Sequence, residues 1–311
     1  MKKLLYMLLL SPLVFSCTSK KHQEEPVPDR GPVDVVLISG QSNGVGCTNS
    51  IYLRDTLPEK YDQFANGFEH IKIAHDCWTK DWPASGITFF SQNTSDGFVP
   101  VKLGQGNGSH SFGPEIGIAD ALNDKYGDKL FLIKFACGGS NLKDDWLERD
   151  SPMYPKMMKY VEDQMAALTK QGYRPTLKAF CWMQGEGDAY QGYYQYYKQN
   201  LEKFVSQLRE DLGKYTGGKT LPFIDAGISG YEEWVYFSQV NKAKKEFAEE
   251  SEYNFYFNTI QAGLHTDQEP YGNPDGAHYD SDSEVQLGHL FADIFEQFLE
   301  PVEIEAPQGN D

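Results

Sequence analysis

Short apolar runs alternate along this chain with longer stretches in which apolar residues recur at every third or fourth position. The apolar runs cover residues 33–39, 130–136, 177–182, 222–228 and 255–258. The helical spacing covers residues 114–126, 155–170, 190–212, 234–250 and 285–299. Apolar strands that alternate with helices predict a parallel sheet covered on both faces. We therefore expect an α/β protein, a three-layer α/β/α sandwich around a doubly wound, mostly parallel, five-stranded sheet.

Residues 47–111 interrupt this alternation. They are rich in glycine, asparagine, serine and aromatic residues, and the segment is too long for a simple connection. In doubly wound sheets, ligands bind beyond the carboxyl ends of the strands. Because the segment leaves the end of the first strand, we expect it to be an insertion that faces the substrate.

The N-terminus has the features of a targeting segment. Residues 1–16 are typical of a lipoprotein signal peptide, with two lysines ahead of an apolar run that is too short to span a bilayer permanently. Cys17 is then the expected lipidation site, and the polar residues 17–32 form a flexible tether. An ordinary signal peptide cleaved nearby is the alternative. The folded domain should cover residues 33–300, with a disordered tail over 301–311.

These features predict a bacterial cell-envelope lipoprotein, on the periplasmic face or the outer-membrane surface, whose only membrane contact is its lipid anchor. The chain carries a net charge of −17. Such a surface repels nucleic acid and anionic lipid, so we expect no nucleic-acid partner. The charge suits a secreted protein that acts on neutral polymers and disfavours polyanionic substrates.

Four cysteines follow Cys17, at positions 47, 77, 137 and 181. No C-x-x-C pair occurs, so the sequence predicts no zinc or other metal site. Cys137 and Cys181 lie at or inside apolar runs, where a cysteine acts as a small core residue. Cys47 and Cys77 fall in loop-rich stretches of an exported chain, and the sequence leaves open whether they form a disulfide.

A serine stands at the end of the first apolar run, in Gly40-Gln41-Ser42-Asn43-Gly44. The same Gly-x-Ser-x-Gly pattern marks the nucleophile elbow of α/β-hydrolases, but there the serine follows a strand built later in the chain. Far along the sequence, Asp275 and His278 share one turn-forming segment. A serine becomes a nucleophile when a histidine takes its proton and a carboxylate orients that histidine. We predict that Ser42, His278 and Asp275 form such a triad.

Four blocks of the sequence resemble, in order, the motifs of the SGNH hydrolases. The blocks are Gly40-Gln41-Ser42-Asn43, Ala136-Cys137-Gly138-Gly139-Ser140, Trp182-Met183-Gln184-Gly185-Glu186-Gly187-Asp188 and Asp275-x-x-His278. The chain looks most like the branch that contains the family-6 carbohydrate esterases (acetyl xylan esterases) and the sialate O-acetylesterases. The resemblance covers roughly residues 33–299, although Gly187 stands where the branch often has serine or alanine. It implies hydrolysis of acetyl esters on glycans through an acyl-enzyme, without metal or cofactor.

The tetrahedral intermediate of such a reaction needs hydrogen-bond donors for its oxyanion. The candidates are the backbone N–H of Ser42, that of Gly138 or Gly139, and the side-chain amide of Gln184. The resemblance suggests Gln184, because the branch has a glutamine where other SGNH enzymes have an asparagine. We expect Asn43 and Glu186 to orient the neighbouring loops.

Two other assignments of the chemistry stay open. His265 competes with His278 as the base, because it lies near the same loop and has Asp267 two residues away. Glu186 and Asp188 raise the possibility of a glycosidase with paired carboxylates. That mechanism needs the two groups about 5 to 9 Å apart across a cleft, which two positions in one loop rarely achieve.

The expected substrate is an acetylated oligo- or polysaccharide, with acetylated xylan first and O-acetylated sialic acid second. Trp78 and Trp82 of the insertion are the candidates for stacking on its sugar rings. The alternative is that both tryptophans pack a small core beneath the insertion. A third hypothesis is a non-catalytic, lipid-anchored protein that binds glycans on a hydrolase scaffold.

Overall fold

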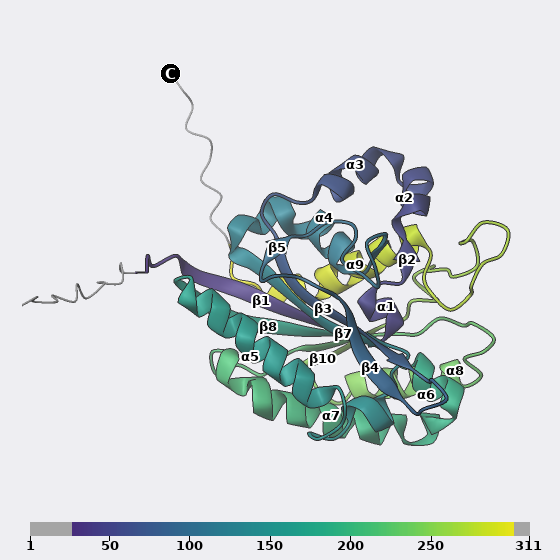
Figure 1. Cartoon of the computed structure of the whole chain (residues 1–311). Helices are drawn as coiled ribbons and strands as arrows, with labels where there is room; N and C mark the ends of the chain where they lie inside the picture. The colour runs from purple at the N-terminus through teal and green to yellow at the C-terminus, as the bar shows by residue number, and fades with distance from the viewer. Residues whose placement is uncertain (1–26, 302–311) are drawn as a thin grey trace, which may run out of the picture.

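A mostly parallel β-sheet runs through the middle of the molecule (Figure 1). The computed structural model describes residues 27–301. Six parallel strands stand in the order β10-β9-β8-β1-β7-β3, and β4 and β5 each pair antiparallel with β3. The strands are β1 (Gly31–Gly40), β3 (Lys72–Asp81), β4 (Thr88–Thr94), β5 (Val99–Pro100), β7 (Leu130–Gly138), β8 (Tyr173–Met183), β9 (Phe223–Ala226) and β10 (Asn254–Phe257).

The predicted α/β class and all five predicted strands are confirmed, but the strand count is wrong. The sheet has eight strands, and the three additional ones, β3, β4 and β5, come from residues 47–111. Strand β3 escaped the sequence pattern because it buries His75 and Lys80 among its apolar residues. The Lys80 ammonium is neutralised inside the protein by Asp145, whose Oδ2 lies 2.7 Å away. Part of the predicted insertion therefore completes the sheet.

Helices cover both faces of the sheet (Figure 1). One layer contains α4 (Glu115–Tyr126) and α9 (Ser281–Phe295), and the other contains α5 (Tyr154–Lys170), α7 (Tyr197–Leu212) and α8 (Phe237–Ala248). Helices α4 and α9 approach closely because both have a glycine at the contact. A Cβ added at Gly117 would lie 1.9 Å from the carbonyl oxygen of Val285.

The shorter elements lie mostly around the site and in the connections. They are α1 (Ser42–Val45), β2 (Thr48–Asn49), α2 (Ser50–Thr56), α3 (Pro58–Asn66), β6 (Ser111–Phe112) and α6 (Glu186–Gln191). Residues 190–212, predicted as one helix, are in fact interrupted. Gly192 adopts a left-handed φ of 78° that ends α6, and α7 begins only at Tyr197. A residue with left-handed backbone angles cannot continue a right-handed helix. The apolar spacing continues across this position, so the spacing alone did not reveal the break.

Three parallel strands end side by side in the middle of the sheet. Gly40 of β1 pairs with Ala136 of β7 on one side and with Met183 of β8 on the other. A Cβ at Gly40 would lie only 1.9 Å from the Met183 carbonyl oxygen, so this close crossing requires glycine. The loops that follow the three strands, which carry Ser42, Gly139 and Gln184, therefore start next to one another.

The cysteines behave partly as expected. Cys137 and Cys181 are buried, as predicted. Cys47 and Cys77 are free thiols, so the disulfide that the sequence left open is not formed.

The signal peptide, Cys17, most of the tether and residues 302–311 lie outside the described residues. Within 27–301, every helix is too short or too polar to cross a bilayer.

Candidate active site

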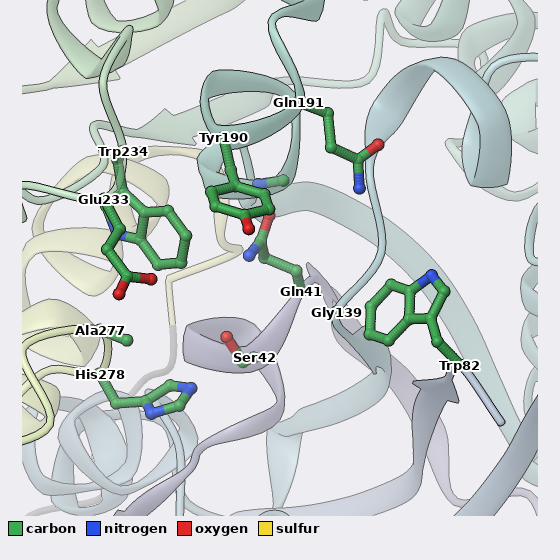
Figure 2. Close-up of a pocket in the computed structure, with 11 residues that line it drawn as sticks. Gln41, Ser42, Trp82, Gly139, Tyr190, Gln191, Glu233, Trp234, Ala277 and His278 are labelled. Carbon is green, nitrogen blue, oxygen red and sulfur yellow. The ribbon is translucent and has the colours of Figure 1, made fainter. Parts of the chain in front are cut away.

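A cavity of about 530 Å³ opens at the carboxyl ends of the strands (Figure 2). Its walls combine residues from the segment directly after β1, from helix α6 and from four loops. The lining residues are Gln41, Ser42, Trp82, Gly139, Gly187, Tyr190, Gln191, Glu233, Trp234, Ala277 and His278. Four residues predicted from the sequence, Ser42, Gly139, His278 and Trp82, thus meet in one cavity. Gly138, Gln184, Asp275 and Trp78 are not among its lining residues.

Ser42 is the first residue of α1, directly after the tight turn that follows β1. The Gly46 N–H donates to the Ser42 carbonyl oxygen (2.8 Å), which closes the turn of α1. The Gln41 N–H donates to the Met183 carbonyl oxygen (2.8 Å), which fixes the chain just ahead of the serine against β8. The side chain is half-buried, and Figure 2 shows it facing the cavity next to the ring of His278. The serine is therefore held on a rigid support with its hydroxyl accessible.

His278 and Asp275 form a hydrogen-bonded pair beside the serine. His278 Nδ1 donates to Asp275 Oδ2 (2.8 Å), and Asp275 Oδ1 accepts the backbone N–H groups of Ala277 (2.8 Å) and His278 (2.9 Å). Because Nδ1 is bonded to Asp275, Nε2 is the ring nitrogen that remains available to a group in the cavity. Within the described residues, no hydrogen bond joins Ser42 to His278. In enzymes without substrate, the hydrogen bond between nucleophile and base is often long and shortens only when substrate binds.

Asn43 ties the serine loop to the histidine loop. Its Nδ2 donates to Glu186 Oε1 (2.8 Å), and its Oδ1 accepts the Tyr279 N–H (3.1 Å). The placement of Asn43 agrees with the loop-tying role predicted for it. Glu186, which was also expected to orient these loops, has the Asn43 side chain as its partner. Since both side chains are almost fully buried, the contact is protected from water.

Gln184 does not fit the oxyanion role predicted for it. Its side chain is fully buried, and its Nε2 donates to Gln41 Oε1 (3.1 Å) and Asp188 Oδ2 (2.7 Å). Its Oε1 accepts the hydroxyl of Tyr197 (3.0 Å). An amide NH₂ has two hydrogens, and both are used inside the protein. The sequence motif identified the loop correctly, but the buried partners of Gln184 could not be read from it.

Two other groups that can donate a hydrogen bond line the cavity. Gly139 lines the cavity with a left-handed φ of 74°, whereas Gly138 does not line it, so Gly139 is the better placed of the two glycines. Gln41 also lines the cavity. Its Oε1 accepts hydrogen bonds from Gln184, from Gly185 N (3.3 Å) and from Gly187 N (3.0 Å), which leaves its Nε2 as the donor available to a ligand. The sequence analysis quoted Gln41 in a motif but gave it no role.

Comparison with known protein families identifies the family of this chain. The carbohydrate esterase family of sialic acid-specific acetylesterases matches residues 32–297. The chain belongs to this family. It is therefore an acetylesterase that acts on carbohydrate esters, and the predicted SGNH-type resemblance is confirmed. None of the curated proteins searched matches the chain.

Solved structures support the fold of the esterase. An Arabidopsis thaliana protein is similar over 86% of this chain and 100% of its own, with 21% identity and a TM-score of 0.57. NanS is similar over 88% of this chain and 99% of its own, with 16% identity and a TM-score of 0.59. At these identities the likeness extends to the fold alone.

The surroundings of His278 favour a positive charge on its ring. Burial alone lowers the pKa of His278, but the hydrogen bond to Asp275 and the neighbouring Cys47 thiol raise it above its ordinary value. Burial likewise raises the pKa of Asp275, but the His278 contacts outweigh this effect and lower it. Cys47 borders a smaller cavity with Asp275 and His278. The esterase is thus built to stabilise the imidazolium that forms when a serine proton is taken up.

The rim of the cavity is aromatic on two sides. Trp82, just past the end of β3, is 54% exposed, and Tyr190 at the end of α6 is 62% exposed. Trp78 lies elsewhere: its ring packs on Phe135 at 6.2 Å and its Nε1 donates to Asp76 Oδ2 (2.7 Å). The paired prediction for the two tryptophans is therefore wrong for Trp78, which has the core-packing role that was the alternative.

Four other residues of the rim were not predicted from the sequence. They are Tyr190, Gln191, Glu233 and Trp234. Trp234 was placed in a predicted helix, but the structure leaves it in the loop before α8. The cluster of aromatic and acidic residues at 231–236 was the one signal that could have indicated a binding loop.

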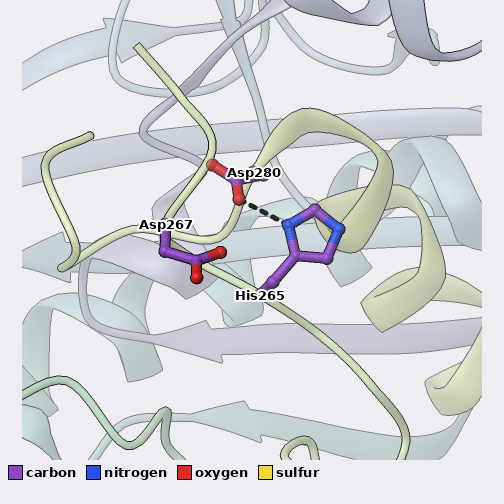
Figure 3. A group of neighbouring side chains, drawn as sticks. All are labelled: His265, Asp267 and Asp280. Carbon is purple, nitrogen blue, oxygen red and sulfur yellow. Dashed lines mark hydrogen bonds and ion pairs between the residues drawn. The ribbon is translucent and has the colours of Figure 1, made fainter. Parts of the chain in front are cut away.

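His265, the alternative base, does not line the cavity. Its ring contacts Asp280, and Asp267 lies close to both (Figure 3). These three side chains form the one His/Cys/Asp/Glu group within residues 27–301 whose ligand atoms lie close enough for a metal ion. Asp280 already accepts the backbone N–H groups of Gln268 (3.1 Å) and Glu269 (2.8 Å), so it fixes its own loop. The group is therefore explained as a structural contact.

The glycosidase alternative also fails. Glu186 and Asp188 are fully buried and do not line the cavity. Asp188 Oδ2 accepts the N–H of Leu142 (2.7 Å) as well as the Gln184 amide, and burial raises its pKa to about 6. Both carboxylates therefore hold loops together and cannot reach a glycosidic bond.

Proposed function

We propose that the esterase removes acetyl groups from neutral glycans, with acetylated xylan as its first substrate, through an acyl-enzyme on Ser42. The Ser42 Oγ attacks the ester carbonyl carbon while His278 Nε2 takes its proton. The tetrahedral intermediate collapses, the C–O bond to the sugar breaks, and His278 returns the proton to the leaving sugar oxygen. Water then attacks the acetyl-serine by the same route and releases acetate.

Three donors are available to the oxyanion of both tetrahedral intermediates. We assign them to the backbone N–H groups of Ser42 and Gly139 and to the Nε2 of Gln41. Each such donor contributes on the order of 3 kcal/mol to lowering the barrier. Asp275 holds the tautomer of His278 that leaves Nε2 free, and its charge stabilises the imidazolium.

One observation carries this proposal: Ser42 and His278 line the same cavity, with Asp275 bonded to the ring nitrogen that faces away from it. The neutral substrate is supported by the rim. Trp82 and Tyr190 present exposed aromatic faces, which stack on the apolar faces of sugar rings. The net charge of −17 also disfavours an anionic polymer.

Replacing Ser42 by alanine tests the nucleophile. We expect turnover of acetylated xylo-oligosaccharides to fall by more than ~10⁴-fold, because no other group in the cavity can form the acyl-enzyme. The melting temperature should stay the same, since only a half-buried hydroxyl is lost. Residual activity within tenfold of the parent enzyme would remove Ser42 from this role.

O-acetylated sialic acid is the second candidate substrate. The family description, which names sialic acid, favours it. Acetate release measured side by side on acetylated xylan, O-acetylated sialic acid and acetylated mannan decides between them. Faster release from the sialic acid than from either neutral glycan would replace our first choice.

We also propose that the enzyme is a lipoprotein anchored through Cys17 in the bacterial cell envelope. The support is the sequence ahead of Cys17, with its lysines, its apolar run and a small residue directly before the cysteine. Incorporation of labelled palmitate into the wild-type chain but not into the Cys17→Ala variant is the expected result. Equal labelling of both would contradict the anchor.

A further inference from the structure

The cavity carries an unusual balance of charge for an enzyme whose family is named for an anionic sugar. Glu233 is the one acidic residue that lines it, and neither lysine nor arginine is among its lining residues in the part of the chain that the structure describes. A sugar carboxylate is ordinarily bound by the paired N–H groups of arginine or by a lysine. The cavity instead presents a carboxylate of its own.

The loop that carries Glu233 is held firmly against the catalytic loop. The ring of Tyr231 lies where a side chain on Gly276 would stand, within 2.3 Å of a Cβ added there. Trp234 packs edge-on against Tyr231 (5.5 Å between ring centres) and against Tyr190 (6.2 Å). Figure 2 shows Glu233 above Ala277 and His278, on the same side of the cavity as the proposed base. Glu233 itself is exposed, and its carboxylate lines the cavity on the side of the proposed base.

Two buried lysines lie close to the walls of the cavity, but they do not offset the charge of Glu233. Lys80, behind Trp82, is bound to Asp145, and Lys244, beneath Gly185, is bound to Asp225 at 2.5 Å. Each of these lysines therefore belongs to a neutral buried pair. Because Glu233 is exposed, water and salt screen its carboxylate, so its repulsion acts mainly on a charge bound next to it in the cavity.

We infer that Glu233 is a specificity-determining residue that rejects acetyl esters of anionic sugars, so that the sugar bound next to the reacting ester is uncharged. This inference rests on the proposed acetylesterase function. It extends that function by naming the residue responsible and by separating this chain from a sialic acid substrate. A sugar carboxylate bound beside Glu233 would place two like charges next to each other in one cavity, which is unfavourable.

A matched pair of substrates tests the inference. An O-acetylated methyl galactoside and the corresponding methyl galacturonoside differ only in a CH₂OH or COO⁻ group at C6. We expect the wild-type enzyme to favour the neutral ester in kcat/KM by at least tenfold. Glu233→Gln should reduce this preference by about five- to tenfold, which corresponds to the loss of one repulsive contact. Glu233→Lys should reduce it further.

The neighbouring Glu232 provides the control. It is exposed, it does not line the cavity, and Glu232→Gln removes the same charge from the same loop. This variant should keep the wild-type preference. Raising the salt concentration should increase the activity of the wild-type enzyme on the anionic ester and have less effect on Glu233→Gln, since screening weakens the repulsion.

Two outcomes would overturn the inference while leaving the esterase function intact. One is a wild-type enzyme that cleaves both esters equally well. The other is a preference that Glu233→Gln leaves unchanged, or that Glu232→Gln reduces just as much. A wild-type enzyme that releases acetate from neither ester, nor from acetylated xylan, would instead overturn the proposed function and the inference with it.

Discussion

Two histidine–carboxylate pairs lie on neighbouring loops of this enzyme, and their difference explains which of them can act as a base. In both, Nδ1 of the ring is bonded to an aspartate: His278 to Asp275 at 2.8 Å and His265 to Asp280 at 2.5 Å. The second nitrogen separates them. His265 Nε2 lies 3.3 Å from Asp282 Oδ1, whereas His278 presents its remaining nitrogen to the cavity that contains Ser42.

A functional group is recognised here by the hydrogen-bonding capacity that the fold leaves unused. His265 is bonded through both nitrogens and its partner Asp280 also fixes two backbone N–H groups, so the pair holds the loop ahead of α9. The same criterion separates the oxyanion candidates. Gln184 has both amide hydrogens committed, whereas Gln41 uses only its amide oxygen inside the protein and keeps its Nε2 for a ligand.

Replacing each histidine in turn is the strongest test of this comparison. We expect His278→Ala to lower kcat/KM on acetyl esters by about 10⁵-fold, because the serine loses its proton acceptor. His265→Ala should lower kcat/KM by less than tenfold and reduce the melting temperature. Kinetics on acetylated xylo-oligosaccharides and thermal melts of both variants give the readout. If His265→Ala is the inactivating change, the triad is misassigned.

The second prediction concerns the partner of the active base. Asp275→Asn keeps an oxygen for the backbone N–H groups of Ala277 and His278, so the loop should hold its shape. It removes the charge beside the ring, and we expect kcat/KM to fall by about 10³-fold, less than for His278→Ala.

The pH profile of Asp275→Asn adds an independent readout. Asp275 raises the pKa of His278, and the base must be neutral to accept a proton, so activity falls as the pH drops through that pKa. Without the carboxylate the pKa of His278 is lower, and the acidic limb of the kcat/KM profile should move to lower pH. An acidic limb that stays in place would show that another group controls it.

The third prediction applies the comparison to Gln184. Gln184→Ala should lower the free energy of unfolding by about 1 to 3 kcal/mol, because Asp188 and Tyr197 lose a buried partner. We expect kcat to fall by less than tenfold. Urea titration and kinetics on one preparation separate the two effects. A loss in kcat above a hundredfold at unchanged stability would return Gln184 to the oxyanion hole.

Much of the fold could be predicted because its central strands are buried on both faces and are therefore almost purely apolar. Residues 35–38 of β1, 130–133 of β7 and 179–183 of β8 are all apolar and buried. The edge of the sheet was missed because β3 contains Lys80 and His75, whose burial depends on partners far away in the sequence. The partner of Lys80, Asp145, lies in a different loop.

The site divides in the same way. The candidate base and its aspartate could be proposed from the sequence because they lie three residues apart in one loop. The partner of His265 was misjudged, because Asp267 is near in sequence while Asp280, fifteen positions away, is the residue in contact. Trp78 and Trp82 lie in the same segment, so its composition does not distinguish them. Because β3 ends at Asp81, Trp78 lies within the strand and packs against the core, whereas Trp82 follows the strand and lines the cavity.

The smallest expected effect concerns the pair of His265 and Asp280, which holds a loop in place. Burial lowers the pKa of His265, but Asp280 and Asp282 raise it overall above its ordinary value of 6.5. A histidine with a raised folded-state pKa stabilises the fold below pH 6.5, and this contribution is lost as the pH rises through the folded-state value. The melting temperature of the wild type should therefore exceed that of His265→Gln by more at pH 5.5 than at pH 8.5, by about 1 to 3 °C. His278 titrates in both proteins and cancels in this difference. A difference between wild type and His265→Gln that is equal at both pH values would mean that the His265–Asp280 contact is not an ion pair in solution.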